Sequence, residues 1–230
     1  MRPDSARAAP SFWQPDWLVL REMARVLRRM LADPALGLRG ARVLDFGCGT
    51  RPYEPWFVAG GARYSGADLD PAHEVSIEDG RLDCADGEFD LVASFQVLEH
   101  VWDISTYLRE ARRAMRGDGW LLLSTHGNWL YHPHPRDYRR WTADGLQREV
   151  ESHGFRLVRM EPVVGPLALT TIFRSLGVAH VLKPLPVVGA ALAALASALF
   201  NARAWLEDRI TPRAITAVNA CTYIALFRRT

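Results

Sequence analysis

Two histidines stand where a proton-accepting side chain could reach a bound substrate. His100 follows an apolar run at 89–95, and His126 follows a second one at 120–125. Both runs are predicted to be strands of an open α/β sheet, and such sheets bind ligands at the carboxyl ends of their strands. An imidazole with a pKa near neutrality can remove the proton of a hydroxyl group. His126 is therefore the first candidate for a catalytic base and His100 the second, although His100 could equally be a structural position.

A glycine-containing turn follows the first predicted strand and could bind a nucleotide-like ligand. The segment 45–50 reads Asp-Phe-Gly-Cys-Gly-Thr, and Gly47 and Gly49 permit a tight turn that a ligand can approach closely. The second predicted strand ends near Asp68, whose carboxylate could accept hydrogen bonds from both hydroxyls of a ribose. Pro52 occupies the position of the third glycine in a dinucleotide-binding fingerprint, so an NAD-dependent oxidoreductase is disfavoured.

An alternation of strands and helices would bring these residues together. Apolar residues at three- and four-residue spacing predict an amphipathic helix from Asp16 to Leu31. Short apolar runs predict strands, and strands that alternate with helices indicate parallel βαβ units covered on both faces. The strands are expected at 41–46, 64–69, 89–95, 120–125, 155–163 and 220–228, and further helices at 104–115 and 142–152.

Four segments resemble, in the same order, the motifs of class I S-adenosylmethionine-dependent methyltransferases of the type 11 branch. They are 43–50, similar to motif I; 88–92 and 96–101, similar to the fourth strand and the segment after it; and 114–120, similar to the turn before strand five. The resemblance implies a doubly wound α/β fold with a mostly parallel, seven-stranded-type sheet and a late antiparallel strand. An N-terminal helix and an apolar helical insertion before the last strand would complete it.

The resemblance also implies a cofactor, S-adenosyl-L-methionine, and the residues that bind it. Gly47 and Gly49 would pass under its methionine part, and Asp45 would order the turn or reach that part through water. Glu78 or Asp79 would approach the adenine amino group, a choice that the shortened third strand leaves open. Ser94, Phe95 and Gln96 would line the inner side of the cofactor. The full set of expected cofactor-binding residues is Asp45, Phe46, Gly47, Cys48, Gly49, Asp68, Leu69, Glu78, Asp79, Ser94, Phe95 and Gln96.

The segment 132–142 follows the fifth predicted strand and reads HPHPRDYRRWT. It resembles a stretch of relatives that are often associated with polysaccharide or natural-product pathways. His132, His134 and Asp137 could be metal ligands, but the alternating prolines indicate a rigid loop and no other ligand cluster supports a site, so no metal is expected. The loop is instead expected to form a wall of the acceptor pocket, where His134 and Tyr138 would contact substrate.

The stretch 160–201 is unusually apolar and lies between the last two predicted strands. Its only formally charged residues are Glu161, Arg174 and Lys183, and 184–200 carries none. The uncharged run is near the lower limit of length for spanning a bilayer, and prolines interrupt its beginning. It could be a buried cap, a homodimer surface, or a lid or membrane-facing surface for an apolar acceptor. Its place between two strands near the carboxyl edge narrowly favours a helical cap over the acceptor side.

The composition is that of one globular domain, with 230 residues of which 49% are hydrophobic and 23% charged. Residues 1–15 are expected to be a flexible arm, and 16–230 a single methyltransferase domain that includes the insertion at 160–201. The net charge of +2, without a dense basic block, argues against nucleic acid as a partner. The three cysteines have no CxxC spacing, and the N-terminus does not resemble a secretory signal. The expected location is the cytoplasm, where the protein could also associate with a membrane through 160–201.

The sequence favours an S-adenosylmethionine-dependent methyltransferase that acts on a small molecule. The acceptor would be an oxygen atom of a sugar, lipid or natural-product intermediate, and it could be apolar. The alternative is a non-catalytic binding or scaffold protein with the same fold. Arg51 raises this alternative, because many relatives carry glycine at that position.

Overall fold

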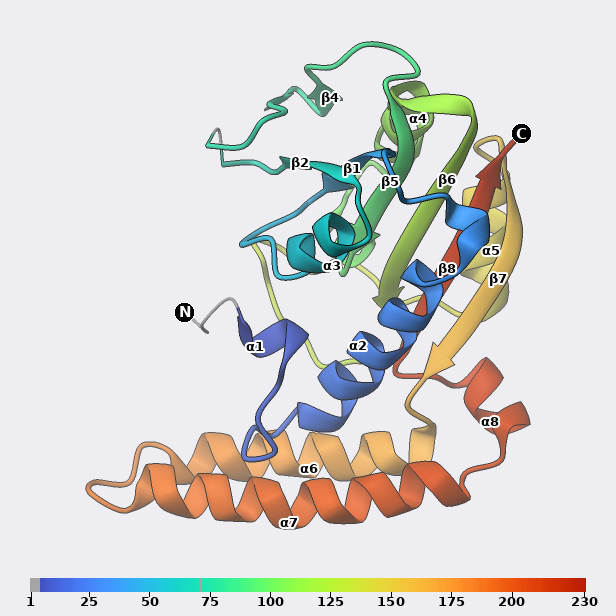
Figure 1. Cartoon of the computed structure of the whole chain (residues 1–230). Helices are drawn as coiled ribbons and strands as arrows, with labels where there is room; N and C mark the ends of the chain where they lie inside the picture. Colours follow the sequence, from blue (N-terminus) through green and yellow to red (C-terminus); the bar gives the residue numbers. More distant parts are fainter. Residues whose placement is uncertain (1–4, 71) are drawn as a thin grey trace.

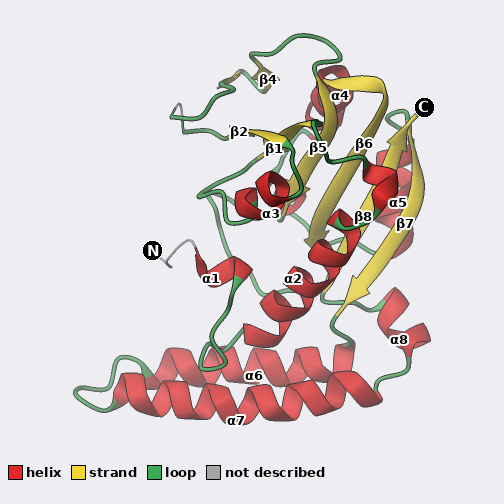
Figure 2. Cartoon of the chain, in the orientation of Figure 1, coloured by secondary structure: helices red, strands yellow, loops and turns green. Residues whose placement is uncertain are grey.

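The computed structural model describes residues 5–70 and 72–230, and a six-stranded sheet forms its centre (Figures 1 and 2). The strands are β1 Arg42–Phe46, β2 Arg63–Ala67, β5 Phe89–Phe95, β6 Met115–His126, β7 Phe155–Val163 and β8 Thr222–Arg229. Their order across the sheet is β2-β1-β5-β6-β8-β7. β8 runs antiparallel to both of its neighbours, and the other pairs between β2 and β6 are parallel. The mostly parallel sheet with a late antiparallel strand is thereby confirmed.

Helices cover both faces of the sheet, because successive strand residues point to opposite sides. Val43 and Leu44 are neighbours in β1, yet they belong to two different apolar clusters, one on each face. The first cluster joins the sheet to α2 (Trp17–Leu31) and α3 (Glu54–Ala59), and the second joins it to α4 (Ile104–Ala114) and α5 (Ala143–Glu151) (Figure 1). This arrangement is the expected doubly wound α/β class.

Side-chain caps fix where the two helices of the second face begin. The Thr142 hydroxyl accepts a hydrogen bond from the backbone N–H of Gly145 at 3.1 Å, as its position before α5 predicts. Asp103 accepts in the same way from the N–H of Thr106 at 3.0 Å, at the start of α4. Gly154 follows α5 with a φ of +82°, a conformation that glycine adopts without strain.

The third strand of the expected seven-stranded type is reduced to a remnant in the described residues. Val75 makes one isolated parallel bridge to Ala67, and the chain then forms a separate hairpin of β3 (Ile77–Glu78) and β4 (Arg81–Leu82). A parallel crossover needs a dozen or more residues, usually with a helix. The chain between β2 and β5 is too short to hold a full strand as well as helical connections on both sides of it.

β6 begins at Met115, earlier than the run at 120–125 suggested. Phe89 lies opposite Met115 and Leu91 lies opposite Trp120, so residues 116–119 bulge out of the ladder. This bulge holds the glycines of the turn that the sequence placed before strand five. The strand therefore continues on both sides of the turn.

The N-terminal segment is more ordered than the flexible arm expected at 1–15. α1 covers Ser5–Ala8, and the side chain of Asn201 donates hydrogen bonds to the carbonyl oxygens of Phe12 and Gln14, both at 2.7 Å. These bonds tie the segment before α2 to the apolar insertion. Residues 1–4 lie outside the described part of the chain.

The apolar insertion forms a helical hairpin of α6 (Pro166–Leu182) and α7 (Gly189–Ile210), followed by the short α8 (Arg213–Val218). It extends beyond the expected end at residue 201. The hairpin starts where β7 ends and crosses below the arrowheads of β6 and β7 in Figure 1. Phe173 of α6 makes an edge contact with Trp129, in the loop after β6, with ring centroids 5.8 Å apart. The insertion therefore lies at the carboxyl edge of the sheet.

Candidate active site

The glycine turn after β1 is held against the end of β2. The N–H groups of Gly47 and Cys48 both donate to the carbonyl of Ala67, at 2.7 and 3.1 Å. Gly47 has a φ of +86°, and a Cβ atom there would lie 2.5 Å from a methyl carbon of Val97. Glycine is thus required at this position both by backbone conformation and by the close packing of Val97.

Asp68 lies at the carboxyl end of β2 and binds the turn directly. Its two carboxylate oxygens accept hydrogen bonds from the N–H groups of Gly49 and Leu69, both at 2.7 Å. A carboxylate oxygen can accept more than one hydrogen bond, so the half-buried Asp68 can still bind ligand hydroxyls. The neighbouring Leu69 side chain is 71% exposed and offers an apolar surface beside this carboxylate.

Asp45 is a buried acid directly before the glycine turn. One of its oxygens accepts a 2.7 Å hydrogen bond from the Tyr64 hydroxyl, and within the described residues the other has no hydrogen-bond partner. Burial raises the pKa of Asp45 to about 7, against the opposing effect of Tyr64. A buried, under-bonded carboxylate at this place suits the cationic amino group of an amino-acid ligand.

Cys48 lies within the same turn and does not have the character of a nucleophile. Its side chain is buried, with the sulfur 3.6 Å from Nδ1 of His73. Burial raises the pKa of the thiol to about 12, so the neutral form prevails at physiological pH.

Arg51 keeps the turn intact although it replaces the glycine of many relatives. Its φ of +55° lies in the left-handed region that explains the glycine preference. The guanidinium group forms two 2.7 Å hydrogen bonds with the carboxylate of Glu74, whose pKa it lowers to about 2. Glu74 also accepts from the N–H of Gly66 in β2, at 2.9 Å.

The expected residues at the end of β5 divide into core and edge positions. Ser94 is fully buried, and its hydroxyl bonds that of Tyr107 at 2.9 Å; Tyr107 also donates to the carbonyl of Phe46. Phe95 is buried too, against the rings of two aromatic residues of the α3 region. Gln96 adopts a φ of +58° and donates through its side chain to Ser124 at 3.1 Å. Of these residues, Gln96 is the one that a ligand at the carboxyl edge could contact.

Glu78 and Asp79 lie on the β3–β4 hairpin and are both exposed. Asp79 has a φ of +48°, as the tight turn of this hairpin requires. Within the described residues, no hydrogen bond or ion pair joins either carboxylate to the glycine turn. The hairpin sits beyond the end of β2 (Figure 1), and the choice between the two acids stays open.

His126 ends β6 and faces a buried carboxylate. Its Nε2 atom lies 3.6 Å from Oε1 of Glu99, and its ring stacks on Trp129 with the planes 3° apart. On the other side, Nδ1 lies 3.3 Å from the hydroxyl of Thr222. Burial lowers the pKa of His126 well below its usual value, so the imidazole is neutral at physiological pH.

Glu99 is the central residue of this group, and sequence reasoning did not single it out. It lies in η2 (Leu98–His100), is fully buried, and accepts a 2.8 Å hydrogen bond from the Thr125 hydroxyl through Oε2. In the part of the chain that is described, Oε1 has no hydrogen-bond partner, and burial raises the pKa of Glu99 to about 7. A glutamate next to His100, after a buried strand, was the available signal.

The loop after β6 brings further histidines to the same place. The ring of His132 lies 4.9 Å from that of His100 and 4.9 Å from that of His126, between centroids. His134 is more distant, at 6.1 Å from His100, and is exposed. Tyr138 donates its N–H to the carbonyl of Glu99 at 2.8 Å, and its ring is 41% exposed. Both expected substrate contacts thus lie on the outer side of this group.

The same loop is held rigid by an internal ion pair. Asp137 accepts hydrogen bonds from both terminal nitrogens of Arg140, at 2.5 and 2.6 Å, and one from the N–H of His132 at 2.9 Å. These bonds lower the pKa of Asp137 below its usual range. The guanidinium of Arg140 also binds two backbone carbonyls of the loop, those of Trp129 and Leu130.

A family model described as a methyltransferase domain matches residues 18–160 of this chain. A probable S-adenosylmethionine-dependent methyltransferase of Mycobacterium tuberculosis is 35% identical over 85 residues, which are 34% of this chain and 31% of that protein. A ubiquinone biosynthesis O-methyltransferase of Aromatoleum aromaticum is 32% identical over 117 residues, 43% of this chain and 50% of that protein. The chain therefore spans half or less of the length of these two relatives.

Among solved structures, a putative sarcosine dimethylglycine methyltransferase from Galdieria sulphuraria superposes with a TM-score of 0.59. The match covers 92% of this chain and 88% of that one, at 13% sequence identity. At this identity the likeness concerns the fold, which is the same α/β arrangement over almost the whole chain.

Proposed function

Because the chain belongs to the methyltransferase domain family, in its class I S-adenosylmethionine-dependent branch, we propose that it methylates an oxygen atom of a small-molecule acceptor. The observation that carries this proposal is the presence of two groups of residues at the same carboxyl edge of the parallel strands. The glycine turn with Asp68 suits the cofactor, and the pair of Glu99 and His126 suits the removal of a proton from an acceptor.

The residues present fit the cofactor that the family uses. Gly47 would allow the methionine part of the cofactor to approach closely. The carboxylate of Asp68 would bind the ribose, and the under-bonded oxygen of Asp45 would bind the amino group. When bound, S-adenosylmethionine supplies an electrophilic methyl group on a cationic sulfur. Arg51 leaves this turn intact, so it gives no support to the non-catalytic alternative.

His126 is the proposed base of the reaction. In its neutral form the imidazole can take the proton of an acceptor hydroxyl, and the nearby carboxylate of Glu99 would stabilise the imidazolium that results. His100 is the second candidate from the same group. The apolar surroundings at Trp129 and Phe173 would keep water away from the reacting oxygen.

The test of this function is turnover with a panel of acceptors. The protein would be incubated with methyl-labelled S-adenosylmethionine and, separately, with lipid-soluble phenols and with sugars. We expect label on an oxygen atom of an acceptor together with release of S-adenosylhomocysteine. Cofactor binding without turnover on any acceptor would favour the non-catalytic alternative, and label on nitrogen or carbon would overturn the oxygen assignment.

We expect replacement of Asp68 by asparagine to weaken cofactor binding. The change keeps the side-chain shape but removes the charge that ribose hydroxyls and the N–H groups of Gly49 and Leu69 bind. Hydrogen bonds to a charged group contribute roughly 1.5 to 3 kcal/mol, so calorimetry should show about 10- to 100-fold lower affinity. Asp70→Asn, at an exposed acid two residues away, is the matched control and should bind normally. Unchanged affinity in Asp68→Asn would remove this residue from the site.

The apolar hairpin of α6 and α7 favours the hypothesis that the protein reaches its acceptor at a membrane surface. α7 is long and apolar enough to cross a bilayer by length and composition, but 33% of that stretch is buried in the fold. Its buried side carries small or polar residues, whereas its exposed side carries large apolar ones. These exposed residues are Leu192, Leu195, Leu199, Leu206 and Ile210, each at least 42% exposed.

The charges around this apolar surface favour an anionic bilayer over a second copy of the chain. The exposed charged residues of the hairpin and α8 are basic: Arg174, Lys183, Arg203, Arg209 and Arg213. The two acids of α7 are turned inward, since Glu207 is buried and bonds Thr171 at 2.5 Å, and Asp208 accepts from the N–H of Gly165 at 2.7 Å. Basic residues beside an apolar helix face are typical of helices that lie in the membrane interface.

Glutamate at both Leu192 and Leu195 should abolish binding to vesicles that contain phosphatidylglycerol. Burial of one leucine side chain contributes roughly 1.5 to 3 kcal/mol, so cosedimentation should weaken by at least about tenfold. Cofactor affinity should not change, because the two residues are exposed on α7 and are not among the residues proposed to bind the cofactor. The matched control is Val58→Glu with Val158→Glu, at exposed apolar residues on α3 and β7.

Two outcomes would contradict the membrane surface. A wild-type protein that stays in the supernatant with these vesicles would exclude it. A wild-type dimer in light scattering, converted to a monomer by the leucine pair, would identify the surface as a homodimer interface instead.

A further inference from the structure

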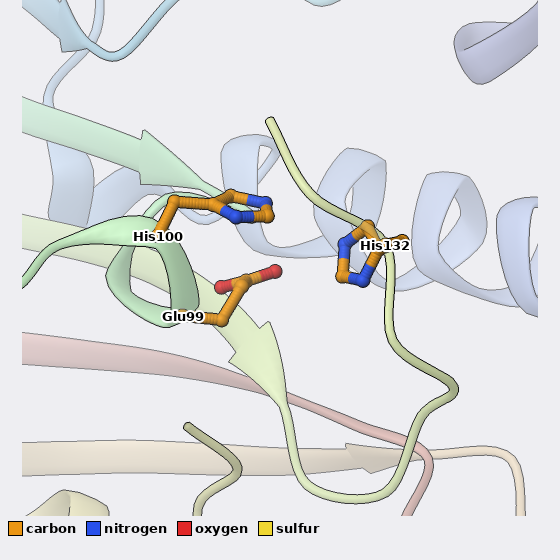
Figure 3. Close-up of side chains that lie close together, drawn as sticks. All are labelled: Glu99, His100 and His132. Carbon is orange, nitrogen blue, oxygen red and sulfur yellow. The ribbon is translucent and has the colours of Figure 1, made fainter. Parts of the chain in front are cut away.

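We propose that Glu99, His100 and His132 form a binding site for a divalent metal ion of the zinc type. Figure 3 shows the carboxylate of Glu99 pointing toward the space between the two imidazole rings. One ligand-type atom of each residue lies within 4.8 Å of the others. Glu99 and His100 come from the segment after β5, and His132 comes from the loop after β6, so the fold brings together ligands that are distant in sequence.

The side chains are close to the spacing that one ion requires. With zinc-to-ligand bonds of about 2.0 to 2.2 Å, the ligand atoms of a tetrahedral site lie about 3.4 Å apart. The group would contract by little more than about one ångström on binding. His132 can make this movement because its side chain is half-buried on a loop, while Glu99 and His100 keep their places in η2.

The outer partners of these residues leave the correct atoms available. Nδ1 of His100 lies 2.6 Å from the carbonyl oxygen of Arg136, and Nδ1 of His132 lies 3.3 Å from both the carbonyl oxygen of Leu130 and a carboxylate oxygen of Asp137. A proton held on Nδ1 by these acceptors leaves the lone pair on Nε2, which is the usual arrangement of metal-bound histidine. Thr125 similarly binds Oε2 of Glu99, which leaves Oε1 for an ion.

The state of Glu99 is an independent indication that a cation belongs there. Its side chain is fully buried, and Oε1 has no hydrogen-bond partner among the described residues. The guanidinium of Arg140, which acts on Glu99 electrostatically, is bound by Asp137 on both of its terminal nitrogens. A buried carboxylate without a full set of partners is costly unless a cation or a proton compensates it.

The donor set selects the class of ion. Two imidazole nitrogens and one carboxylate oxygen suit zinc and similar transition metals, whereas magnesium and calcium prefer oxygen ligands. Three protein ligands leave a fourth position open for water or an acceptor hydroxyl. His126 lies next to Glu99, with Nε2 3.6 Å from Oε1, and remains the candidate base, because a metal-bound His100 has no nitrogen left to take a proton. Only a catalytic role of the ion rests on the proposed function; binding of the ion does not.

Metal binding by the whole chain tests the proposal without any acceptor. Protein treated with a chelator would be titrated with Zn²⁺ by calorimetry and with Co²⁺ by visible absorption. We expect one equivalent of Zn²⁺ to bind, and Co²⁺ to give the absorption of a site with nitrogen ligands. His132→Ala and Glu99→Gln should each remove this binding, and Asp137→Asn should weaken it roughly 10- to 100-fold by loosening His132.

His180→Ala is the matched control, because His180 is an exposed histidine on α6, far along the chain from this site. It should bind Zn²⁺ like the wild type. Wild-type protein without a stoichiometric Zn²⁺ site, or tight binding that survives both His132→Ala and Glu99→Gln, would overturn the proposal. Displacement of Zn²⁺ by equimolar Mg²⁺ would overturn the assignment to a zinc-type ion. Cofactor affinity would be measured on the same variants, and normal affinity would show that each variant is folded. Because neither measurement needs an acceptor, a missing metal site can be told apart from missing methyl transfer.

Discussion

Gly47→Val is expected to abolish cofactor binding. A Cβ atom at this position would lie 2.5 and 2.9 Å from the two methyl carbons of Val97, and the φ of +86° is one that a β-branched residue avoids. A strained left-handed residue alone costs about 1 to 3 kcal/mol, and relief of the clash would move the turn that carries the N–H bonded to Ala67. Calorimetry with S-adenosylmethionine should show a loss of at least about 100-fold.

Gly40→Val is the matched control for this variant. Gly40 also has a positive φ, +78°, but a Cβ atom there would meet nothing within 4 Å. The control therefore carries the same backbone strain without the clash, and it lies before β1 rather than in the turn. We expect it to lose some stability and to keep its affinity. If Gly47→Val folds and binds the cofactor like the wild type, the cofactor lies elsewhere.

Local patterns were sufficient to predict most of the sheet and the glycine turn after β1. The strands at 42–46, 89–95 and 155–163 follow from short apolar runs, and α5 follows from the cap at Thr142. The glycine turn was predictable because a tight turn at a strand end needs residues with positive φ. In each of these cases the signal lies within a few neighbouring residues.

The acceptor side of the site depends on contacts between distant segments. Glu99 is a buried, under-bonded acid only because η2, the end of β6 and the loop of Asp137 pack together. The prediction against a metal considered His132 with its neighbours His134 and Asp137. In the fold His132 instead lies beside His100, and a carboxylate oxygen of Asp137 contacts its Nδ1 atom. Spacing within one loop could not indicate this arrangement.

The apolar insertion was recognised by composition, but its orientation was not. Nothing in the apolar run tells which side of a helix faces the fold, because alanine suits both a buried and an exposed position. In the structure α7 buries Ala193, Ser197 and Asn201, since small side chains allow close packing on α6, and the leucines remain outside. The bonds from Asn201 to the segment before α2 help to fix this side inward.

His126→Ala should slow methyl transfer strongly while cofactor affinity stays near that of the wild type. The imidazole contacts Glu99 and Trp129, which follow β5 and β6, whereas the turn proposed to bind the cofactor follows β1. A general base typically contributes about 10²- to 10⁴-fold, and single-turnover rates with an acceptor from the panel would measure this loss. Thr222→Val, which keeps the imidazole and removes the hydroxyl 3.3 Å from Nδ1, is the positioning control. It should cost less than about tenfold, since the base itself remains.

Metal binding separates the two roles at this edge of the sheet. His126 is not among the three proposed ligands, so His126→Ala should still bind one equivalent of Zn²⁺, whereas His132→Ala should not. Slow transfer in His126→Ala with intact metal binding would identify the imidazole as the group that takes the acceptor proton. Full turnover in this variant would contradict that role, because the reaction would then need only alignment of acceptor and cofactor in a dry site.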